Sequence, residues 1–154
     1  MDAILPLWEL APALKTKLMY LAMVAQMMIA IYCYRAMSKA RVAAVRAKRI
    51  TPDEYKSTAS EPEDLRALTR AVANQFEMPV LFYALLLATL TAGSQSWITV
   101  ILAWSYVVLR GVHAGEMISS NNVMRRRRIF IRSAQVLLLI MVEFVLAVLF
   151  WIEI

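Results

Sequence analysis

The chain has 154 residues, of which 61% are hydrophobic and 18% are charged, and its formal net charge is +6. Average soluble domains are about half apolar and about a quarter charged, so the composition argues against a soluble protein and favours one that folds in lipid. One cysteine and one histidine exclude a disulfide framework and give no basis for a metal site, and the basic residues flank apolar segments, so we expect no nucleic-acid partner.

Four apolar segments are long enough to cross a bilayer as α-helices. They cover approximately residues 14–34, 65–91, 97–118 and 129–151. A membrane-spanning helix needs about 20 mainly apolar residues. We therefore predict an all-α fold, an integral membrane four-helix bundle that forms a single domain over residues 1–154.

The first connection and the second segment carry signals for helix starts and breaks. Residues 51–54 and 60–63 both have the pattern of a capping box, which predicts a helix start at each. The spacing of apolar residues after Arg35 predicts that the first helix continues beyond the bilayer into water. Pro79 has no amide hydrogen and is expected to kink the second segment.

Positive charge is distributed unequally between the two sides of the predicted bundle. Most of the 17 lysines and arginines lie in or beside the first and third connections, whereas the other side has only Lys15 and Lys17. Cytoplasmic loops carry an excess of such residues. We therefore expect these two connections in the cytoplasm and both termini outside, with the four arginines at 125–128 in contact with phospholipid headgroups.

Two groups of polar residues fall inside the second and third predicted spans, where charges are costly and call for a partner or a role. Arg70, Asn74 and Glu77 occur at i, i+4 and i+7, which predicts that they share one helix face. Arg110 and His113 occur at i and i+3 on the third span. At about 1.5 Å per residue, both groups fall in the cytoplasmic half of the bilayer.

Two interpretations of this polar group remain open. The side chains either pair with one another and hold the bundle together, or they form an anion-binding pocket with Arg35 and the arginines at 125–128 at its mouth. Arginine binds carboxylates bidentately, while Asn74 can recognise an amide and Glu77 an amine. The same two interpretations apply to Gln26 and Glu143: each side chain either makes a contact between helices or belongs to the functional site.

At these residues the sequence resembles the membrane-associated proteins in eicosanoid and glutathione metabolism, the MAPEG family. The resemblance covers nearly the whole chain and rests on three motifs: Arg70-x-x-x-Asn74-x-x-Glu77 with Pro79 two residues on, Arg110-x-x-His113, and Asn122-Val123-Met124 followed by arginines. The third motif resembles bacterial members, which implies a bacterial inner membrane.

The resemblance implies a homotrimer that binds glutathione, as a cosubstrate and without a metal, between neighbouring subunits near the cytoplasm. Arg126 is the implied catalytic residue that stabilises the glutathione thiolate, with Arg125 and Arg127 left open; a nearby cation lowers a thiol pKa from about 8.5. The implied glutathione-binding residues are Arg35, Arg70, Asn74, Glu77, Arg110 and His113.

The implied activity is that of a glutathione transferase or peroxidase acting on a lipophilic electrophile. One departure argues for an alternative. Transferase members carry a tyrosine seven residues after the arginine of the third span, and here that position is Met117, which cannot donate a hydrogen bond. The alternative is a non-catalytic membrane protein of the same fold that binds a ligand or a partner.

Overall fold

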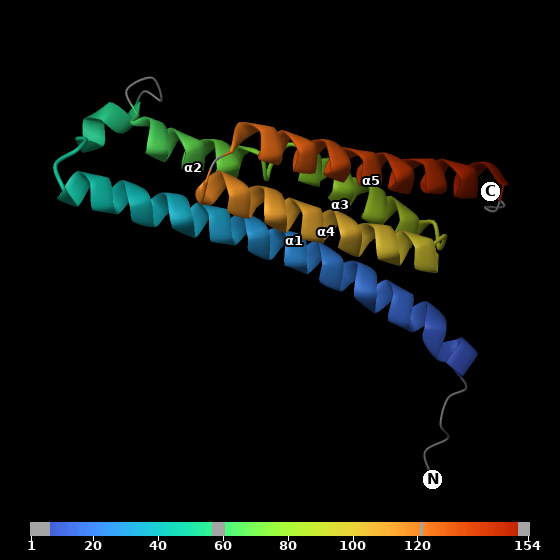
Figure 1. Ribbon diagram of the computed structural model, residues 1–154. Helices are drawn as coiled ribbons and strands as arrows, with labels where there is room; N and C mark the ends of the chain where they lie inside the picture. The colour runs from blue at the N-terminus through green and yellow to red at the C-terminus, as the bar shows by residue number, and fades with distance from the viewer. Residues whose placement is uncertain (1–6, 57–60, 121, 151–154) are drawn as a thin grey trace, which may run out of the picture.

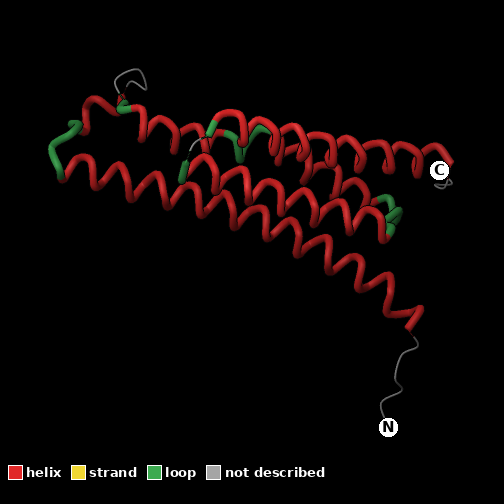
Figure 2. The backbone as a smooth tube through the Cα atoms, in the orientation of Figure 1, coloured by secondary structure: helices red, strands yellow, loops and turns green. Residues whose placement is uncertain are grey.

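A computed structural model describes residues 7–56, 61–120 and 122–150, and all regular structure in these ranges is helical. The elements are α1 (Leu7–Arg46), the short 3-10 helix η1 (Pro52–Lys56), α2 (Glu63–Ala73), α3 (Met78–Thr91), α4 (Trp97–Ile118) and α5 (Val123–Phe150). The helices lie lengthwise beside one another, with α4 packed against α1 and α5, and α5 against α3 (Figures 1 and 2).

Four stretches of the described chain are long and apolar enough to cross a membrane. They are Ala11–Arg46, Glu63–Thr91, Trp97–Ile118 and Val123–Phe150. Large apolar side chains such as Leu21, Met28 and Ile101 are exposed on the outside, whereas a soluble monomer rarely exposes continuous apolar surface. The chain is therefore an all-helical, multi-pass membrane protein.

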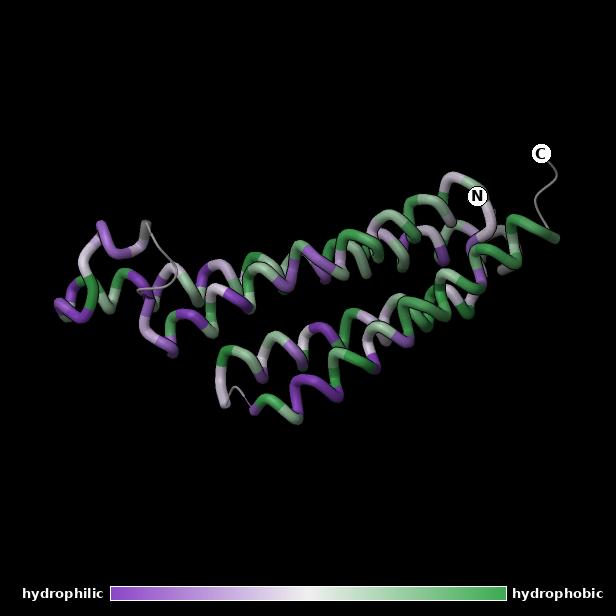
Figure 3. The backbone as a smooth tube through the Cα atoms, turned by 90° about the horizontal axis from the view of Figure 1, so that it is seen from above, coloured by the Kyte–Doolittle hydropathy of each residue, from purple (hydrophilic) through white to green (hydrophobic). Residues whose placement is uncertain are grey.

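The core lies between the helices and is as apolar as the outer surface. Phe82 of α3 stacks on Tyr106 of α4, with ring centroids 4.5 Å apart. The other members of this cluster are Met19, Ala22, Met23, Leu86, Val100, Ala103, Val107, Leu137 and Ile140. Polar residues gather at one end of the bundle, where α1 runs past α4 and α5 (Figure 3). We refer to this end as the basic end.

At the basic end, α1 continues as predicted and stops at Arg46. The predicted capping box at residues 51–54 begins η1: the Thr51 amide and hydroxyl donate to Glu54 Oε2 at 2.5 and 2.8 Å. These bonds hold the pKa of Glu54 below its usual value. The second predicted box includes Ser60, which lies outside the described residues, and α2 begins at Glu63 after Pro62, whose side chain makes no cap.

The second predicted span is confirmed as Glu63–Thr91, but it consists of two helices, so the expectation of one continuous, kinked helix was wrong. α2 ends at Ala73 and α3 begins at Met78. Pro79 supplies the reason, because it cannot donate to the carbonyl of Gln75 and its ring crowds that carbonyl. Pro79 instead lies in the first turn of α3, where a missing amide hydrogen costs little.

The other two helices start at side-chain caps. Ser96 and Thr99 form a reciprocal capping box at the start of α4, which has the bounds expected for the third segment. α5 begins at Val123, earlier than the expected residue 129, because Asn122 Oδ1 accepts from the Arg125 amide at 3.0 Å and caps the helix there. The four arginines at 125–128 therefore lie in the first turns of α5.

Candidate functional site

A polar cavity of about 250 Å³ opens at the basic end, between α2, α4 and α5. Its walls consist of Arg70, Asn74, His113, Met117, Arg126, Arg127 and Phe130. Four of these are predicted site residues: Arg70, Asn74, His113 and Arg126. The cavity therefore combines three guanidinium groups with an amide and an imidazole, which is a donor set suited to an anion.

Arg70 lies in the last turn of α2 and already holds a carboxylate. Its Nη2 donates to Glu63 Oε1 at 2.8 Å, and Glu63 Oε2 lies 3.4 Å from Arg66 Nη1. Arg70 Nε is buried and has no hydrogen-bond partner among the described atoms. The Arg70 guanidinium is thus oriented to bind a carboxylate, and its Nε donor is still available for a further hydrogen bond.

Asn74 is the C-terminal cap of α2, where the chain leaves the helix. Its Nδ2 donates to the Arg70 carbonyl at 2.8 Å and approaches Met117 Sδ at 3.8 Å. A thioether is a weak acceptor, so the contact of the Asn74 amide with Met117 is weak. Met117, seven residues after Arg110, forms part of the cavity wall.

Arg110 is fully buried beside the cavity rather than lining it. Its Nη2 donates to the Asn74 carbonyl at 2.5 Å. In a membrane protein every backbone carbonyl needs a partner, and the break after Ala73 removes the helical partner of the Asn74 carbonyl. Arg110 supplies that partner from α4, while its Nε and Nη1 have none within the described parts of the chain.

The arginines at 125–128 divide between two environments. Arg126 and Arg127 line the cavity. Arg125 turns to α4 instead, where its Nε lies 3.2 Å from Glu116 Oε2, and Glu116 also accepts from the Ser120 hydroxyl. Successive helical positions differ by about 100°, so the four side chains cannot share one direction. Arg125 is therefore paired beside α4, whereas Arg126 and Arg127 line the cavity.

Other predicted residues do not reach the cavity of a single chain. Arg35 is exposed on α1, and Glu77 is exposed at the N-cap of α3. The expectation that Glu77 shares one helix face with Arg70 was wrong, because the break after Ala73 intervenes. Gln26 forms an interhelical bond, its Nε2 donating to Gln75 Oε1 at 3.1 Å. Glu143 accepts from the Ser96 hydroxyl, again between helices.

Phe130 is the cavity residue that the sequence analysis missed. The centroid of its ring lies 5.7 Å from the centroid of the His113 ring. The same centroid lies 6.0 Å from Arg110 Cζ. Helical spacing contained the signal, because Phe130 follows Arg126 by four positions and Arg127 by three. An apolar residue in an apolar span gave no other reason to select it.

A larger apolar groove of about 500 Å³ lies between α3 and α5, and it shares α5 with the polar cavity. It is lined by Met78, Leu81, Ala84, Leu85 and Ala88 of α3 and by Ala134, Leu137, Leu138 and Met141 of α5. On α5 these positions extend the face that carries Arg127 and Phe130, because both sets follow a spacing of three and four residues. On α5, the residues of the polar cavity and those of the apolar groove therefore share one helix face.

The described residues contain no group of three or more His, Cys, Asp or Glu side chains placed to hold a metal ion. Cys33 is buried in α1 and makes no disulfide. The polar groups that line the cavity are the guanidinium groups of arginine, an amide and an imidazole.

The fold and this cavity define a class: a multi-pass helical membrane protein with a basic polar site between its helices. The sequence matches the MAPEG family over residues 18–146, most of the chain. The protein belongs to the MAPEG family, the membrane proteins of eicosanoid and glutathione metabolism. No curated protein and no solved structure gave a match.

Proposed function

We propose that the protein binds glutathione in the polar cavity and conjugates its thiol to a lipophilic electrophile, or uses it to reduce a lipid peroxide. The observation that carries this proposal is the convergence of Arg70, Arg126 and Arg127 with Asn74 on one cavity. Glutathione has two carboxylates, an amine, two amides and a thiol. Guanidinium and amide groups are the donors that recognise carboxylates and peptide groups.

Arg126 is the proposed catalytic residue. A thiolate attacks an electrophile far faster than a thiol, and a cation beside the sulfur lowers the thiol pKa toward neutral. Arg126 and Arg127 both line the cavity, while Arg125 is paired with Glu116. In conjugation the sulfur loses its proton and forms a carbon–sulfur bond, while the electrophile releases a leaving group or takes up a proton. In peroxide reduction the thiolate attacks one oxygen, the O–O bond breaks and an alcohol is released, and a second glutathione converts the resulting sulfenic acid into glutathione disulfide and water.

The proposed site is shared between copies in a homotrimer. Sites for drug-sized ligands usually enclose roughly 300–1,000 Å³, and the cavity of one chain, at about 250 Å³, is smaller and open to the surface. Arg35 and Glu77 are exposed on the single chain. A neighbouring copy that brings its Arg35 to the cavity would enclose the ligand.

The apolar groove is the proposed position of the lipophilic substrate. Its walls are wholly apolar, and it follows the α3–α5 seam away from the cavity. A molecule dissolved in the bilayer can enter it sideways and place its reactive carbon near Phe130. The basic end would lie in the cytoplasm, since most lysines and arginines are there, and the third sequence motif supports a bacterial inner membrane.

Met117 favours a second candidate function, a non-catalytic ligand-binding protein. The cavity wall has a thioether where a hydroxyl donor could have faced the thiolate. Glutathione could then bind without being activated. Turnover of a model electrophile that depends on Arg126 decides between the two functions.

Calorimetric titration of the detergent-solubilised protein with glutathione tests the proposal. Arg70→Ala is expected to weaken binding by about tenfold or more, because a charge-assisted carboxylate contact is lost. Arg126→Ala is expected to bind glutathione but to lose turnover. Arg128→Ala is the matched control, since Arg128 is exposed and does not line the cavity. Absence of binding by the correctly assembled wild type would contradict the proposal.

A further inference from the structure

The short helix α2 carries Arg70 and ends beside Asn74, yet it has only 11 residues. Isolated helices shorter than about 12–15 residues are marginal even with favourable sequences. The break after Ala73 separates α2 from α3, and Pro62 at its start provides no side-chain cap. Contacts with other elements must therefore fix the position of α2.

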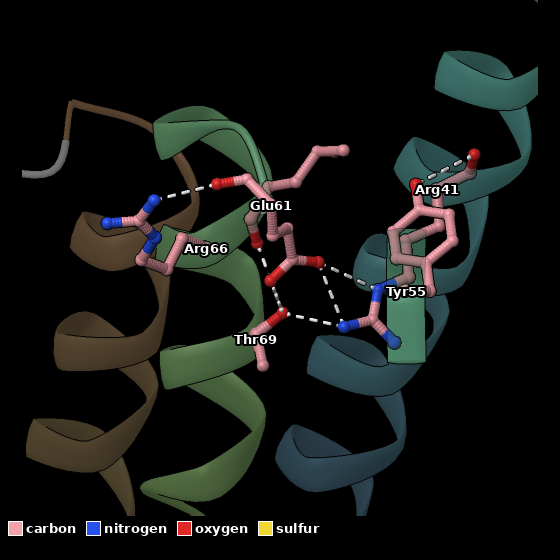
Figure 4. Close-up of polar contacts among 6 residues, drawn as sticks. Arg41, Tyr55, Glu61, Arg66 and Thr69 are labelled. Carbon is pink, nitrogen blue, oxygen red and sulfur yellow. Dashed lines mark hydrogen bonds and ion pairs between the residues drawn. The ribbon is translucent and has the colours of Figure 1, made fainter. Parts of the chain in front are cut away.

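A buried carboxylate joins the start of α2 to α1. The side chain of Glu61 is only 1% exposed. Arg41 of α1 donates to Glu61 Oε1 from Nε at 3.0 Å and from Nη2 at 2.9 Å (Figure 4). Because a buried charge is tolerated only when it is paired and hydrogen-bonded, Glu61 and Arg41 depend on each other.

Thr69 closes this contact from within α2. Its hydroxyl donates to Glu61 Oε2 at 2.8 Å and accepts from Arg41 Nη2 at 2.9 Å (Figure 4). We refer to Arg41, Glu61 and Thr69 as the Glu61 clamp. Thr69 immediately precedes Arg70, so the clamp acts on the turn of α2 that carries the cavity arginine.

Neighbouring groups hold both ends of the clamp. The Arg41 guanidinium lies over the Tyr55 ring, 5.0 Å from its centroid, and the Tyr55 hydroxyl donates to the Arg41 carbonyl at 3.3 Å. Arg66 Nη2 donates to the Glu61 carbonyl at 2.8 Å. A small apolar cluster of Ala44, Ile50 and Leu65 packs beside these groups. The contact is therefore far more constrained than a surface ion pair.

We propose that Glu61 is a positioning residue for ligand binding: the Glu61 clamp fixes α2 on the extension of α1 and so sets Arg70 and Asn74 for the ligand. The proposal rests on the proposed glutathione site. It gives a role to the part of α1 that runs past α4 and α5 (Figure 1), because this extension provides the surface on which α2 is held. The clamp does not touch the cavity, and its effect passes through α2.

Conservative variants at Thr69 test the clamp without changing any charge. Thr69→Val keeps the shape but removes the hydroxyl, whereas Thr69→Ser keeps the hydroxyl. Glu61→Gln removes the charge. Asp64→Asn is the matched control, because Asp64 also joins the start of α2 to the end of α1, through Arg49 at 3.1 Å, but that pair is exposed. Glutathione binding is measured by calorimetry, and backbone exchange by hydrogen–deuterium exchange without glutathione.

Thr69→Val and Glu61→Gln are expected to weaken glutathione binding by about five- to tenfold. Amide exchange should rise in residues 63–73 and stay unchanged in α4. Thr69→Ser and Asp64→Asn should resemble the wild type in both measurements. The proposal is overturned if Thr69→Val matches the wild type, or if Asp64→Asn is as damaging as Glu61→Gln. If the wild type does not bind glutathione, the proposed function is contradicted instead. The exchange data then still show whether the Glu61 clamp fixes α2.

Discussion

At the scale of single residues, the cavity arginines are sorted by the carboxylates around them. Glu116 holds Arg125 away from the cavity, whereas Glu63 pairs with Arg70, which lines it. The pair of Glu63 and Arg70 is exposed, and such pairs contribute little because solvent competes for both partners. A carboxylate of the proposed ligand would therefore compete with Glu63 for Arg70.

Glu63→Gln is expected to raise glutathione affinity by about two- to fivefold, because the ligand no longer competes with a resident carboxylate for Arg70. Calorimetry measures the change, and its size should shrink as salt rises. Asp64→Asn removes the same charge one residue along and should leave the affinity unaltered. Equal or weaker binding by Glu63→Gln would contradict the competition.

Met117→Tyr tests whether the missing hydroxyl limits activation of the thiol. A phenol that donates to the thiolate is expected to lower the pKa of bound glutathione by about one unit. The thiolate absorbance of the complex, followed against pH, gives this value. Met117→Phe adds a similar ring without the donor and should leave the thiol pKa as in the wild type. The same pKa in both variants would show that the position does not face the sulfur.

At the scale of helices, the break between α2 and α3 organises the site. It frees the Asn74 carbonyl for Arg110 of α4 and places Asn74 at a helix end rather than on a continuous face. Pro79 causes the break, because a proline removes one helical hydrogen bond and obstructs another. The position of Asn74 in the cavity is thus a consequence of a residue that does not line it.

Pro79→Ala is expected to let α2 and α3 join into one helix and to weaken glutathione binding by about tenfold or more, through misplacement of Asn74. Slower amide exchange between Gln75 and Pro79 would report the joined helix, and calorimetry would report the affinity. Pro62→Ala, outside the break, is the control. An unchanged affinity despite slower exchange would contradict the role of the break.

At the scale of the whole molecule, a single chain does not bring all of the predicted site residues together. Arg35 is exposed on α1, whereas the cavity lies between α2, α4 and α5. In a ring of identical subunits, each interface joins different surfaces of two neighbours. A site assembled at such an interface would take Arg35 from one copy and Arg70 from the next.

Co-expression of Arg35→Ala and Arg70→Ala subunits tests this arrangement. Each variant alone is expected to bind glutathione poorly. In an equal, random mixture of the two subunits, about a quarter of all sites would combine an intact Arg35 with an intact Arg70 and bind normally. Titration of the purified mixture measures the fraction of competent sites. No recovery in the mixed assemblies would place both arginines in the same subunit's site or outside it.

The sequence by itself determined the class of the protein. The four apolar stretches and the unequal distribution of basic residues depend only on which residues are neighbours in the sequence. They can therefore be recognised without knowledge of the fold. Spacing also selected Arg70, Asn74 and His113, and the family resemblance implied Arg126; all four line one cavity. It selected Arg110 as well, although that side chain supports the Asn74 carbonyl instead of lining the cavity.

Only the tertiary structure decided which partners these residues take. The Glu61 clamp, the Glu63–Arg70 pair and the Glu116–Arg125 pair each join groups whose separation depends on how helices and turns approach one another. Charge and periodicity cannot choose among many arginines and carboxylates, because an ion pair depends on a few ångströms of distance and on burial. The packing of α1 against α2, and of α4 against α5, makes that choice.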